Sequence, residues 1–352
     1  MFRVYSQKFY DDKSIREQFE KKYISILVAK AKKASVKENI SDTESCSLYD
    51  FCNKNLDLLC KNHTSICLPK NFEDLLILSP RAMAEIVIQF WNDTNFSNDV
   101  KNLINKSIWR NGATKNTSIL LDYDYFSDEI AQHFLNNEDE EIYTINTCFY
   151  CNRAYINSYE TTASAKKRQF DLDHFIPKSE CPLFALSLYN FVPSCQVCNS
   201  RIKNAGIYYK TISIVDDLEK LFPTSINYNY DAALTFRIVP CKKIYWEKKK
   251  FGEFKDIPES FAIEFEQKDN GELYKSEADA FDIINRYKHH KKEFLSYIDK
   301  LRKYPASYFL MLAQNTSIPN ATELHEAIFD TKLRNEQKMI FQKIYNDIDS
   351  NI

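Results

Sequence analysis

The stretches that decide the fold are Cys148-Phe149-Tyr150-Cys151, Asp173-His174-Phe175 and Cys195-Gln196-Val197-Cys198-Asn199. The two Cys-x-x-Cys pairs can supply four thiolates to one tetrahedral zinc ion. A shell of four cysteines is closed and leaves no position for a substrate, so we expect this zinc to be structural. The alternative is four free cysteines in hydrophobic cores, and the repeated spacing favours zinc.

The bulk properties limit the possible functions. The chain has 352 residues and a formal net charge of -2, so nucleic-acid binding would require local basic patches. We find no apolar segment typical of a signal peptide, and no run of about 18 apolar residues typical of a membrane span. We therefore expect a cytoplasmic protein, without membrane contact, whose thiols are free or bound to metal.

The remaining six cysteines allow two interpretations, a second metal cluster or ordinary thiols. A second metal cluster between Cys46 and Cys67, with His63 nearby, is one of them. Their irregular spacing, without any Cys-x-x-Cys, favours ordinary buried or surface thiols. His63, His133 and His325 have no metal-like partners in the sequence, and we interpret them as structural.

The first 140 residues have mainly helical patterns. Apolar residues recur at helical spacing in 14–33. Ser79 followed by Pro80 predicts the start of a helix that continues to Trp91. Ser127 is expected to cap a further helix over 128–135. The acidic run 136–141 is then the best candidate for a domain boundary.

Strands are expected in the rest of the chain. Residues 170–176 alternate and predict a strand that ends at the Asp-His pair, and a short helix should run from Asn199 to Ala205 and stop at Gly206. Further on, 234–239 and 261–266 alternate, and Asp269-Asn270-Gly271 is typical of a hairpin turn. Ser276 is expected to open a helix that reaches Leu301.

The residue types around the Asp-His pair suit metal-dependent phosphodiester hydrolysis. This reaction needs an activated water, neutralised phosphoryl oxygens and help for the leaving oxygen. Asp173 supplies a carboxylate, His174 an imidazole and Asn199 a carbonyl oxygen. Neighbouring side chains on a strand point to opposite faces, so Asp173 can bind a metal while His174 addresses the far side of the phosphorus.

These residues resemble a known family. Cys-x-x-Cys, then Asp-His-Phe-Ile-Pro-Lys at 173–178, then Tyr-Asn-Phe-Val-Pro-Ser-Cys-x-x-Cys-Asn at 189–199, resembles the zinc-supported HNH endonucleases of the ββα-metal class. The resemblance is specific from Cys148 to Lys203. It extends loosely to 287–292, which is similar to the region after the nuclease core in bacterial defence proteins of the Septu and related retron systems.

The helix and strand patterns, together with the resemblance for the nuclease core, predict an α+β fold with three parts. These are a helical N-terminal region of unknown role at 1–140, a ββα-metal HNH nuclease core with a four-Cys zinc site at 141–212, and an α/β C-terminal region at 213–352 in which strands precede helices.

The family also implies roles for individual residues. His174 resembles the general base, Asp173 the catalytic metal ligand, and Asn190 the residue that ties the loop to the strand and orients the base. Asn199 takes the third position, where many members have a histidine, which makes the chain an H-N-N variant. Because an amide oxygen is a harder ligand than imidazole, we expect Mg²⁺ or Mn²⁺ at the catalytic site.

The predicted phosphate contacts are basic residues. Many members have a lysine three residues after the last motif residue, but here Ile202 takes that place between Arg201 and Lys203. The candidates for phosphate contact are Arg153, Lys178, Arg201, Lys203 and the run Lys166-Lys167-Arg168. The basic clusters at 248–250 and 288–292 are further candidates. Each of them is alternatively a solvated surface charge.

The expected function is a metal-dependent endonuclease that cleaves DNA, with RNA not excluded. The resemblance implies a bacterial anti-phage defence effector that works with an ATPase, a reverse transcriptase or another defence subunit. One alternative is a restriction-type endonuclease. The other is a zinc-stabilised, non-catalytic nucleic-acid-binding or adaptor protein, which the asparagine at the third position favours.

Overall fold

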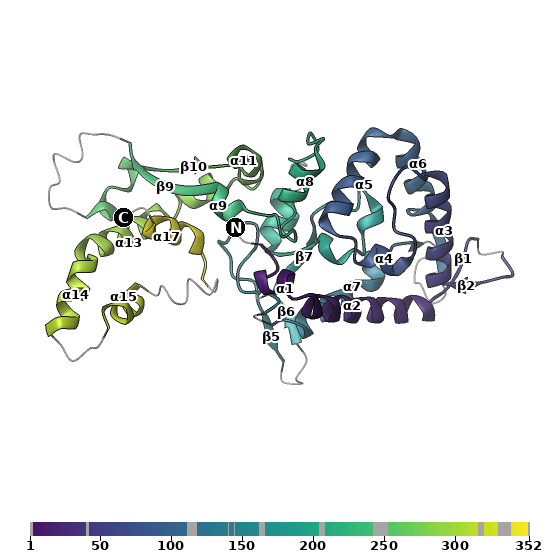
Figure 1. The fold of residues 1–352 in the computed structure, drawn as a ribbon, viewed down its shortest axis with the longest axis horizontal. Helices are drawn as coiled ribbons and strands as arrows, with labels where there is room; N and C mark the ends of the chain where they lie inside the picture. Colours follow the sequence, from purple (N-terminus) through teal and green to yellow (C-terminus); the bar gives the residue numbers. More distant parts are fainter. Residues whose placement is uncertain are drawn as a thin grey trace.

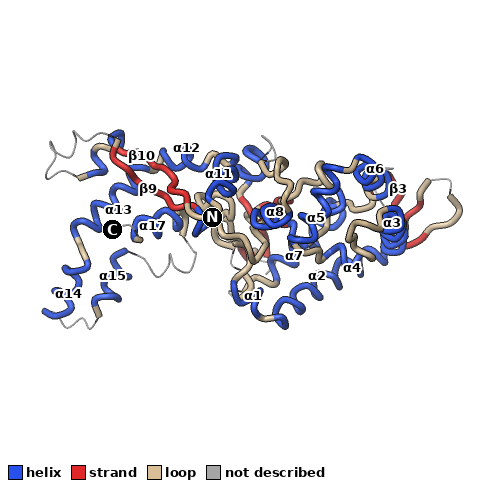
Figure 2. Tube along the Cα trace, turned by 45° about the horizontal axis from the view of Figure 1, so that its top comes forward, coloured by secondary structure: helices blue, strands red, loops and turns tan. Residues whose placement is uncertain are grey.

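A computed structural model describes residues 3–39, 42–110, 118–139, 141–143, 145–161, 166–203, 208–241, 253–315, 320–329 and 339–350. The fold is α+β, as predicted, with many helices and small antiparallel sheets. The molecule is elongated, with helices of the N-terminal and C-terminal regions toward opposite ends (Figures 1 and 2). Strand β7 (Asp171–His174) lies between them in Figure 1. None of the described helices combines the length and apolar character needed to span a membrane.

The N-terminal region is mainly helical, as predicted. Its helices are α1 (Gln7–Asp11), α2 (Lys13–Lys33), α3 (Leu48–Asn62), α4 (Phe72–Leu76), α5 (Pro80–Asn92), α6 (Thr94–Leu103) and α7 (Tyr123–Asn136). A small sheet of order β2-β1-β3-β4 was not predicted; its strands are β1 (Ser35–Lys37), β2 (Cys46–Ser47), β3 (Ser107–Arg110) and β4 (Ser118–Ile119). Strands this short carry too little alternation to show in the sequence.

Two of the three predicted N-terminal helices are confirmed. Helix α2 buries Phe19, Tyr23 and Leu27, and the Ser79 hydroxyl caps α5 by accepting from the Ala82 N–H at 3.2 Å. The predicted start at Ser127 is wrong. Helix α7 contains the predicted range 128–135 but begins five residues earlier, at Tyr123, because the Asp122 carboxylate caps it, so Ser127 lies inside the helix.

The middle of the chain contains two short hairpins. Strands β5 (Ser158–Glu160) and β6 (Lys166–Arg168) form the first, and β7 (Asp171–His174) and β8 (Phe191–Ser194) form the second. The predicted strand ending at the Asp-His pair is therefore confirmed. A π-helix, η3 (Val197–Ile202), follows β8. The predicted helix thus starts two residues early, while Ala205 and Gly206 lie outside the described residues.

The connection between β7 and β8 contains two 3-10 turns, η1 (Pro182–Phe184) and η2 (Leu188–Asn190). We call β7, β8 and η3 together the hairpin unit. In its register Asp171 pairs with Ser194 and His174 with Phe191.

The C-terminal region has two strands and a series of short helices. Strands β9 (Leu234–Pro240) and β10 (Phe261–Gln267) pair antiparallel, as their alternation predicted. The other elements are α8 (Val215–Leu221), α9 (Tyr230–Ala233), η5 (Phe254–Asp256), η6 (Pro258–Ser260), α11 (Gly271–Ala280), α12 (Ile283–Lys288), α13 (Lys291–Lys303), α14 (Ala306–Asn315), α15 (Ala321–Phe329) and α17 (Gln342–Asp349). The basic cluster at 248–250 lies outside the described residues.

Two predictions about this region are wrong. Asn270 adopts a left-handed conformation with φ 61° and leads into α11 instead of a hairpin turn. Gly271 begins that helix, and a Cβ on it would lie 2.6 Å from the Cβ of Gln267, so only glycine fits. The predicted helix from Ser276 to Leu301 is divided into α11, α12 and α13, with Asp282 left-handed at the first break.

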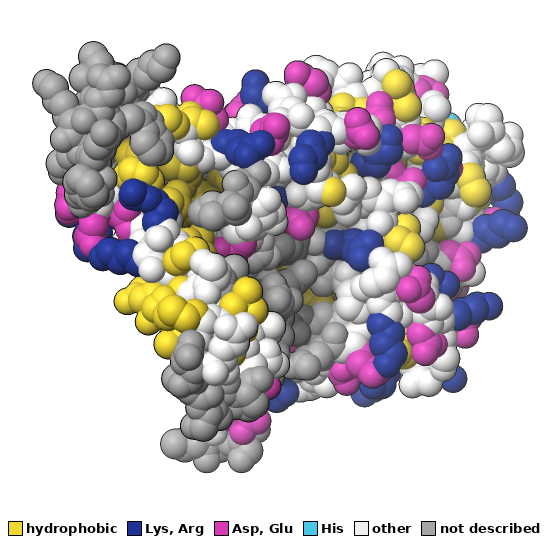
Figure 3. All heavy atoms as spheres, turned by 60° about the vertical axis from the view of Figure 1, so that its left-hand side comes forward, with side chains coloured by type: hydrophobic (Ala, Val, Ile, Leu, Met, Phe, Trp, Pro, Cys, Tyr) yellow, Lys and Arg dark blue, Asp and Glu magenta, His cyan; other side chains and the backbone are white. Residues whose placement is uncertain are grey.

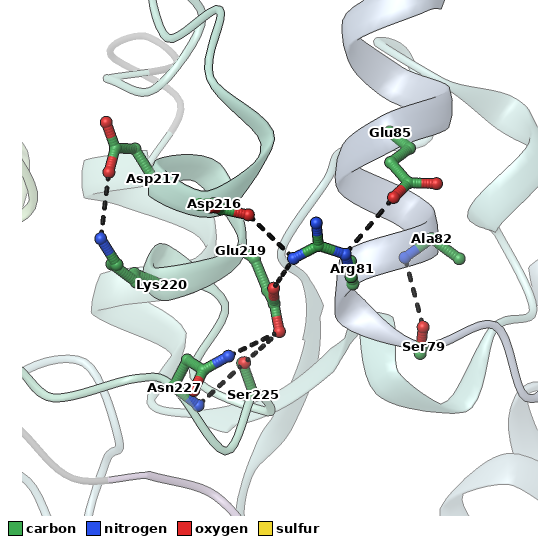
Figure 4. A network of polar contacts seen from close by, with 10 residues as sticks. All are labelled: Ser79, Arg81, Ala82, Glu85, Asp216, Asp217, Glu219, Lys220, Ser225 and Asn227. Atoms are coloured by element: carbon green, nitrogen blue, oxygen red, sulfur yellow. Dashed lines mark hydrogen bonds and ion pairs between the residues drawn. The ribbon is translucent and has the colours of Figure 1, made fainter.

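The parts of the chain share one core. A continuous cluster of buried hydrophobic residues runs through all three predicted regions, so their boundaries stay a prediction. Polar contacts also join them: Arg81 at the start of α5 pairs with Asp216 and Glu219 of α8 at 2.8 and 3.2 Å, and Ser225 and Asn227 hold the other Glu219 oxygen (Figure 4). These contacts fix the helices on one side of the hairpin unit.

The surface is of mixed charge. Lysine and arginine alternate with aspartate and glutamate on the face shown in Figure 3, as expected for a net charge of -2. Hydrophobic side chains gather toward the C-terminal end of that face. On α14 the exposed large hydrophobic residues are Leu310 and Met311.

Candidate functional site

The four cysteines of the two pairs lie together. Their sulfur atoms are all within 4.8 Å of one another, and all four residues are buried. Within the described ranges, this is the only group of three or more His, Cys, Asp or Glu side chains placed to share a metal ion. The group could hold a metal ion such as zinc, which takes four thiolates in a tetrahedral shell.

The surroundings of the cluster suit a thiolate-bound cation. The backbone N–H of Cys195 donates to the Cys148 sulfur at 3.3 Å, and the Arg286 guanidinium of α12 donates to the Cys198 sulfur at 3.3 Å. Donors of this kind stabilise thiolates, and metal-bound thiolates commonly accept such bonds. The four cysteines form no disulfide, so all four sulfurs are available as ligands. The donor set therefore fits structural zinc.

The other cysteines and histidines behave as ordinary residues. Cys46 and Cys67 are exposed and Cys52 is buried, so no second cluster forms among the described residues. The Nε2 atom of His63 lies 2.9 Å from an Asp99 oxygen. His133 is buried among aromatic rings of the N-terminal region, and His325 packs against two phenylalanines of the C-terminal helices.

The first Cys-x-x-Cys turn is closed by an unusual residue. Asn152 is fully buried with φ 46°, a left-handed conformation that asparagine tolerates better than most residues. Its backbone N–H donates to the Cys148 carbonyl at 2.8 Å, and its side chain donates to Thr147 at 2.9 Å. This geometry places Cys148 and Cys151 on the same side of the turn.

The C-terminal region holds the outside of that turn. The Tyr287 hydroxyl donates to the Cys151 carbonyl at 2.7 Å, and the Phe341 N–H donates to the Asn152 carbonyl at 2.6 Å. Arg153, predicted to contact phosphate, lies partly buried with its Nε 3.2 Å from the Nε2 of His290. The cysteine cluster therefore lies between the hairpin unit and the C-terminal helices.

Asp171 and Asp173 face the π-helix from one side of β7, two residues apart. Asn199 donates through its Nδ2 to Asp171 at 3.1 Å, and Lys203 forms an ion pair with Asp173. Because the amide nitrogen of Asn199 is held by Asp171, its carbonyl oxygen stays available to a cation. Asp173 and Asn199 therefore both lie where β7 meets η3. Asn199 is hydrogen-bonded to Asp171, and Asp173 is paired with Lys203.

Asp173 retains one oxygen for a ligand. The Tyr150 hydroxyl donates to its Oδ2 at 2.6 Å, and Lys203 contacts the same oxygen. Oδ1 has no donor among the described residues. Burial raises the pKa of Asp173, against the opposing effect of Lys203, and burial lowers the pKa of Lys203. The pair is thus a buried ion pair beside an available carboxylate oxygen.

The π-helix explains why Lys203 occupies this position. Lys203 is its C-cap and the fourth residue after Asn199, and residues four apart lie on the same side of a helical turn. Ile202, the third residue after Asn199, is packed against the hydrophobic core instead. The lysine displaced by one position in the sequence therefore reaches the strand, while Arg201 is exposed.

His174 lies on the opposite side of β7 and is buried. Its ring lies 4.8 Å from the ring of Tyr123 and 4.9 Å from that of Phe191, and its Nε2 is 2.9 Å from the Ala185 carbonyl oxygen. A carbonyl can only accept, so Nε2 carries the hydrogen and Nδ1 of the neutral ring has a free lone pair. Burial lowers the pKa of His174 to about 3, so the ring is neutral at pH 7.

Asn190 ties the connection between β7 and β8 together. Its Oδ1 accepts from the Ile176 N–H at 2.8 Å, and its Nδ2 donates to the carbonyls of Ile176 and Phe184 at 3.0 and 3.1 Å. The side chain is fully buried. Phe184 precedes Ala185, so Asn190 fixes the segment whose carbonyl orients His174.

Sequence reasoning did not single out Tyr123, Tyr150, Asp171 or Arg286. Asp171 and Tyr150 had a local signal, since one lies two residues before Asp173 and the other lies within the first cysteine pair. Tyr123 and Arg286 are far from the motif in sequence, and only the fold brings them to the site.

A cavity of about 400 Å³ lies elsewhere, and none of the predicted site residues lines it. Its walls come from α2, from the start of α5 and from the segment after α8. Comparisons of the chain with protein-family models, curated proteins and solved structures found no match.

Proposed function

We propose that this protein is a divalent-metal-dependent HNH endonuclease that hydrolyses DNA phosphodiester bonds, with the hairpin unit as its ββα-metal core. The observation that supports it most is the arrangement on the two sides of β7. One side carries a neutral imidazole with a free Nδ1, and the other carries available oxygens of Asp173 and Asn199.

In this proposal His174 is the general base. Its Nδ1 takes a proton from the attacking water, and the Ala185 carbonyl stabilises the imidazolium through the Nε2–H. Asn190 keeps that carbonyl in place. The lowered pKa of His174 keeps the base unprotonated at neutral pH.

The oxygens of Asp173 and Asn199 would hold a hard cation, Mg²⁺ or Mn²⁺, on the scissile phosphate. When bound, such an ion neutralises the charge on the phosphoryl oxygens and assists the leaving 3′ oxygen, which leaves a 5′ phosphate. Lys203 remains beside Asp173 and limits the negative charge of the site before a cation arrives.

The test is a nicking assay on supercoiled DNA and on labelled RNA with Mg²⁺ or Mn²⁺. His174→Ala should lower the rate by about 10²–10⁴ because the general base is lost. His289→Ala is the matched control, since His289 is exposed and lies outside the site. Equal cleavage by wild type and His174→Ala, with the zinc content unchanged in both, would refute the mechanism.

A non-catalytic, zinc-stabilised nucleic-acid-binding or adaptor protein is the second candidate. The ion pair of Lys203 with Asp173 favours it, because it satisfies the carboxylate without a metal. Titration of the zinc-loaded protein with Mn²⁺ separates the two functions. A second divalent site that disappears in Asp173→Asn supports the nuclease, whereas zinc alone under every condition supports the adaptor.

We further propose that the nuclease acts in the bacterial cytoplasm as an anti-phage defence effector with a partner ATPase or reverse transcriptase. This part is based on the resemblance of the motifs alone. A neighbouring ATPase gene would support it, whereas a neighbouring methyltransferase gene would favour a restriction-type endonuclease. Full activity of the purified chain without any partner would count against an obligatory partner.

A further inference from the structure

Tyr123 belongs to the N-terminal region, yet it lies against the candidate base. It is the first residue of α7, and its ring packs edge-to-face on the His174 ring with centroids 4.8 Å apart and planes at 77°. The ring also lies 5.7 Å from Phe191, the strand partner of His174. Tyr123 is half-buried, so part of the residue is exposed to solvent.

Two exposed cations flank this ring from different elements. The Lys178 ammonium, in the segment after β7, lies 4.8 Å from the ring centroid. The Arg168 guanidinium, at the end of β6, lies close enough to the Tyr123 hydroxyl to oppose the rise that burial causes in the pKa of Tyr123. Among the described residues, neither cation forms an ion pair with a carboxylate, so both remain available to an anionic ligand.

The arrangement has the chemistry of a phosphodiester-chain contact. Nucleic-acid backbones are held by arginine and lysine, and aromatic rings beside such cations contact bases or sugars. Asp124 and Asp171 lie close enough to raise the pKa of Tyr123 as well. Asp171 accepts a hydrogen bond from Asn199 and Asp124 is exposed to solvent, whereas the Lys178 ammonium lies directly against the Tyr123 ring.

We propose that Tyr123, Arg168 and Lys178 form the surface that holds the nucleic-acid strand beside His174, with phosphates on the two cations and the ring edge against the chain between them. This deepens the proposed function and depends on it for the identity of the reaction. It also gives the N-terminal region a role in substrate binding, because that region supplies the Tyr123 ring, which positions Arg168 and Lys178 next to His174.

The experiment measures binding separately from cleavage. Fluorescence anisotropy with labelled single-stranded DNA, double-stranded DNA and RNA is recorded over a range of salt concentrations, in the cleavage-deficient His174→Ala background. The test variant is Arg168→Gln with Lys178→Gln. The matched control is Lys167→Gln. The sequence also made Lys167 a candidate for phosphate contact, but on β6 it is the neighbour of Arg168 and its exposed side chain points to the other face of the hairpin.

The double variant should bind at least 10-fold more weakly. Two lost phosphate contacts should also lower the slope of log K against log salt by roughly 1.8 on duplex DNA and roughly 1.4 on single strands. Lys167→Gln should change this slope by less than one phosphate contact would, which is roughly 0.9 on duplex DNA and roughly 0.7 on single strands. The substrate with the largest loss identifies the class that the site accepts.

Tyr123 is tested in the chain that retains His174. Tyr123→Phe removes only the hydroxyl and should weaken binding less than Tyr123→Ala, which removes the ring. Both variants should keep the zinc content of the parent, although Tyr123→Ala should melt at a lower temperature because it loses ring packing on His174 and Phe191. Faster cleavage by Tyr123→Ala would overturn the proposal, since the ring would then act as a cover over His174.

The outcomes separate this inference from the proposed function. If wild type nicks DNA but the double variant binds like Lys167→Gln, the contact surface is refuted and the nuclease stands. If no substrate is cleaved with either metal while the double variant loses affinity and salt slope, the nuclease is refuted and the surface stands. Absence of nucleic-acid binding by the parent overturns the surface itself.

Discussion

The cysteine cluster and the Asp173 site belong to the same hairpin unit, but they balance their charge in opposite ways. Four sulfurs lie within 4.8 Å of one another with one guanidinium beside them, so a cation is needed to hold them as thiolates. Asp173 instead has an ammonium and a hydroxyl on one of its oxygens. The first site is therefore suited to a permanently bound ion, and the second can exist with or without one.

This difference predicts which of the two sites depends structurally on the other. The cluster joins the turn before β7 to the junction of β8 and η3, and the C-terminal helices hold it from outside. The Asp173 site lies on the interface that this cluster fixes. Loss of the cluster should therefore affect both sites, whereas changes at Asp173 should leave the cluster intact.

The largest effect is expected from Cys151→Ser. Structural zinc contributes on the order of 10 kcal/mol to the folding of small zinc domains, so the variant should lose its zinc and much of its cooperative unfolding. Zinc content by mass spectrometry and melting by circular dichroism measure this. Cys241→Ser is the control, because Cys241 is exposed and outside the cluster. One retained zinc per chain with an unchanged melting temperature would show that the cluster is not a metal site.

A smaller effect is expected from Lys203→Met. The variant leaves the buried carboxylate of Asp173 without its counter-charge, which typically costs about 3–5 kcal/mol. Added Mg²⁺ or Mn²⁺ should recover part of this loss, because a cation on the free oxygen replaces the ammonium. Chemical denaturation with and without the metal measures the recovery.

The control for this variant is Lys210→Met, whose ion pair with Glu180 is largely exposed and should contribute at most about 1 kcal/mol. A Lys203→Met protein that is destabilised but gains nothing from divalent ions would argue against a catalytic metal at Asp173. It would favour the adaptor function.

The same contrast shows what the sequence could reveal. The cysteine cluster was predictable because each pair supplies its ligands from one local turn, so spacing alone determines the geometry. The strand ending at Asp173 and His174 was predictable from its alternation. The hairpin turn predicted at Asp269-Asn270-Gly271 was wrong because the same left-handed residue can also lead into a helix.

The partners of the catalytic candidates could not be predicted in this way. Tyr123 reaches His174 only through packing of α7 against β8, and the π-helical turn that brings Lys203 to Asp173 has no signature in a single sequence. Tertiary contacts of this kind determine the electrostatics of the site. The motif identifies the residues, and the fold determines their protonation and accessibility.

Asn190→Ala should have an intermediate effect on stability and a large effect on catalysis. Three buried hydrogen bonds are lost, and the unsatisfied groups at Ile176 and Phe184 should cost about 2–4 kcal/mol. Asn199→Ala is the matched comparison, because it loses a single half-exposed bond and should cost less than about 1 kcal/mol. If Asn190 positions the base and Asn199 binds the metal, only Asn199→Ala should raise the metal concentration needed for cleavage. The same metal dependence in both variants would contradict this division.

The smallest expected effect is a change in acid sensitivity, and two histidines allow a matched test. Burial lowers the pKa of both His174 and His133 from 6.5 to about 3. Between these values the unfolded chain binds a proton on each ring and the folded chain does not, so stability falls as the pH falls. Each histidine contributes at most about 1.4 kcal/mol per pH unit to this loss.

His174→Gln and His133→Gln should therefore each reduce the loss of unfolding free energy between pH 6 and pH 5 by about 1 kcal/mol. Denaturant titrations at both pH values measure it, with the zinc content determined at each pH because protons compete with zinc for thiolates. Only His174→Gln should also abolish cleavage, because His133 lies in the N-terminal core away from the hairpin unit. An unchanged pH slope in His174→Gln would mean that the His174 ring is already charged or solvated in the folded protein. A charged ring has no free lone pair, so His174 could not then act as the general base in the form described above.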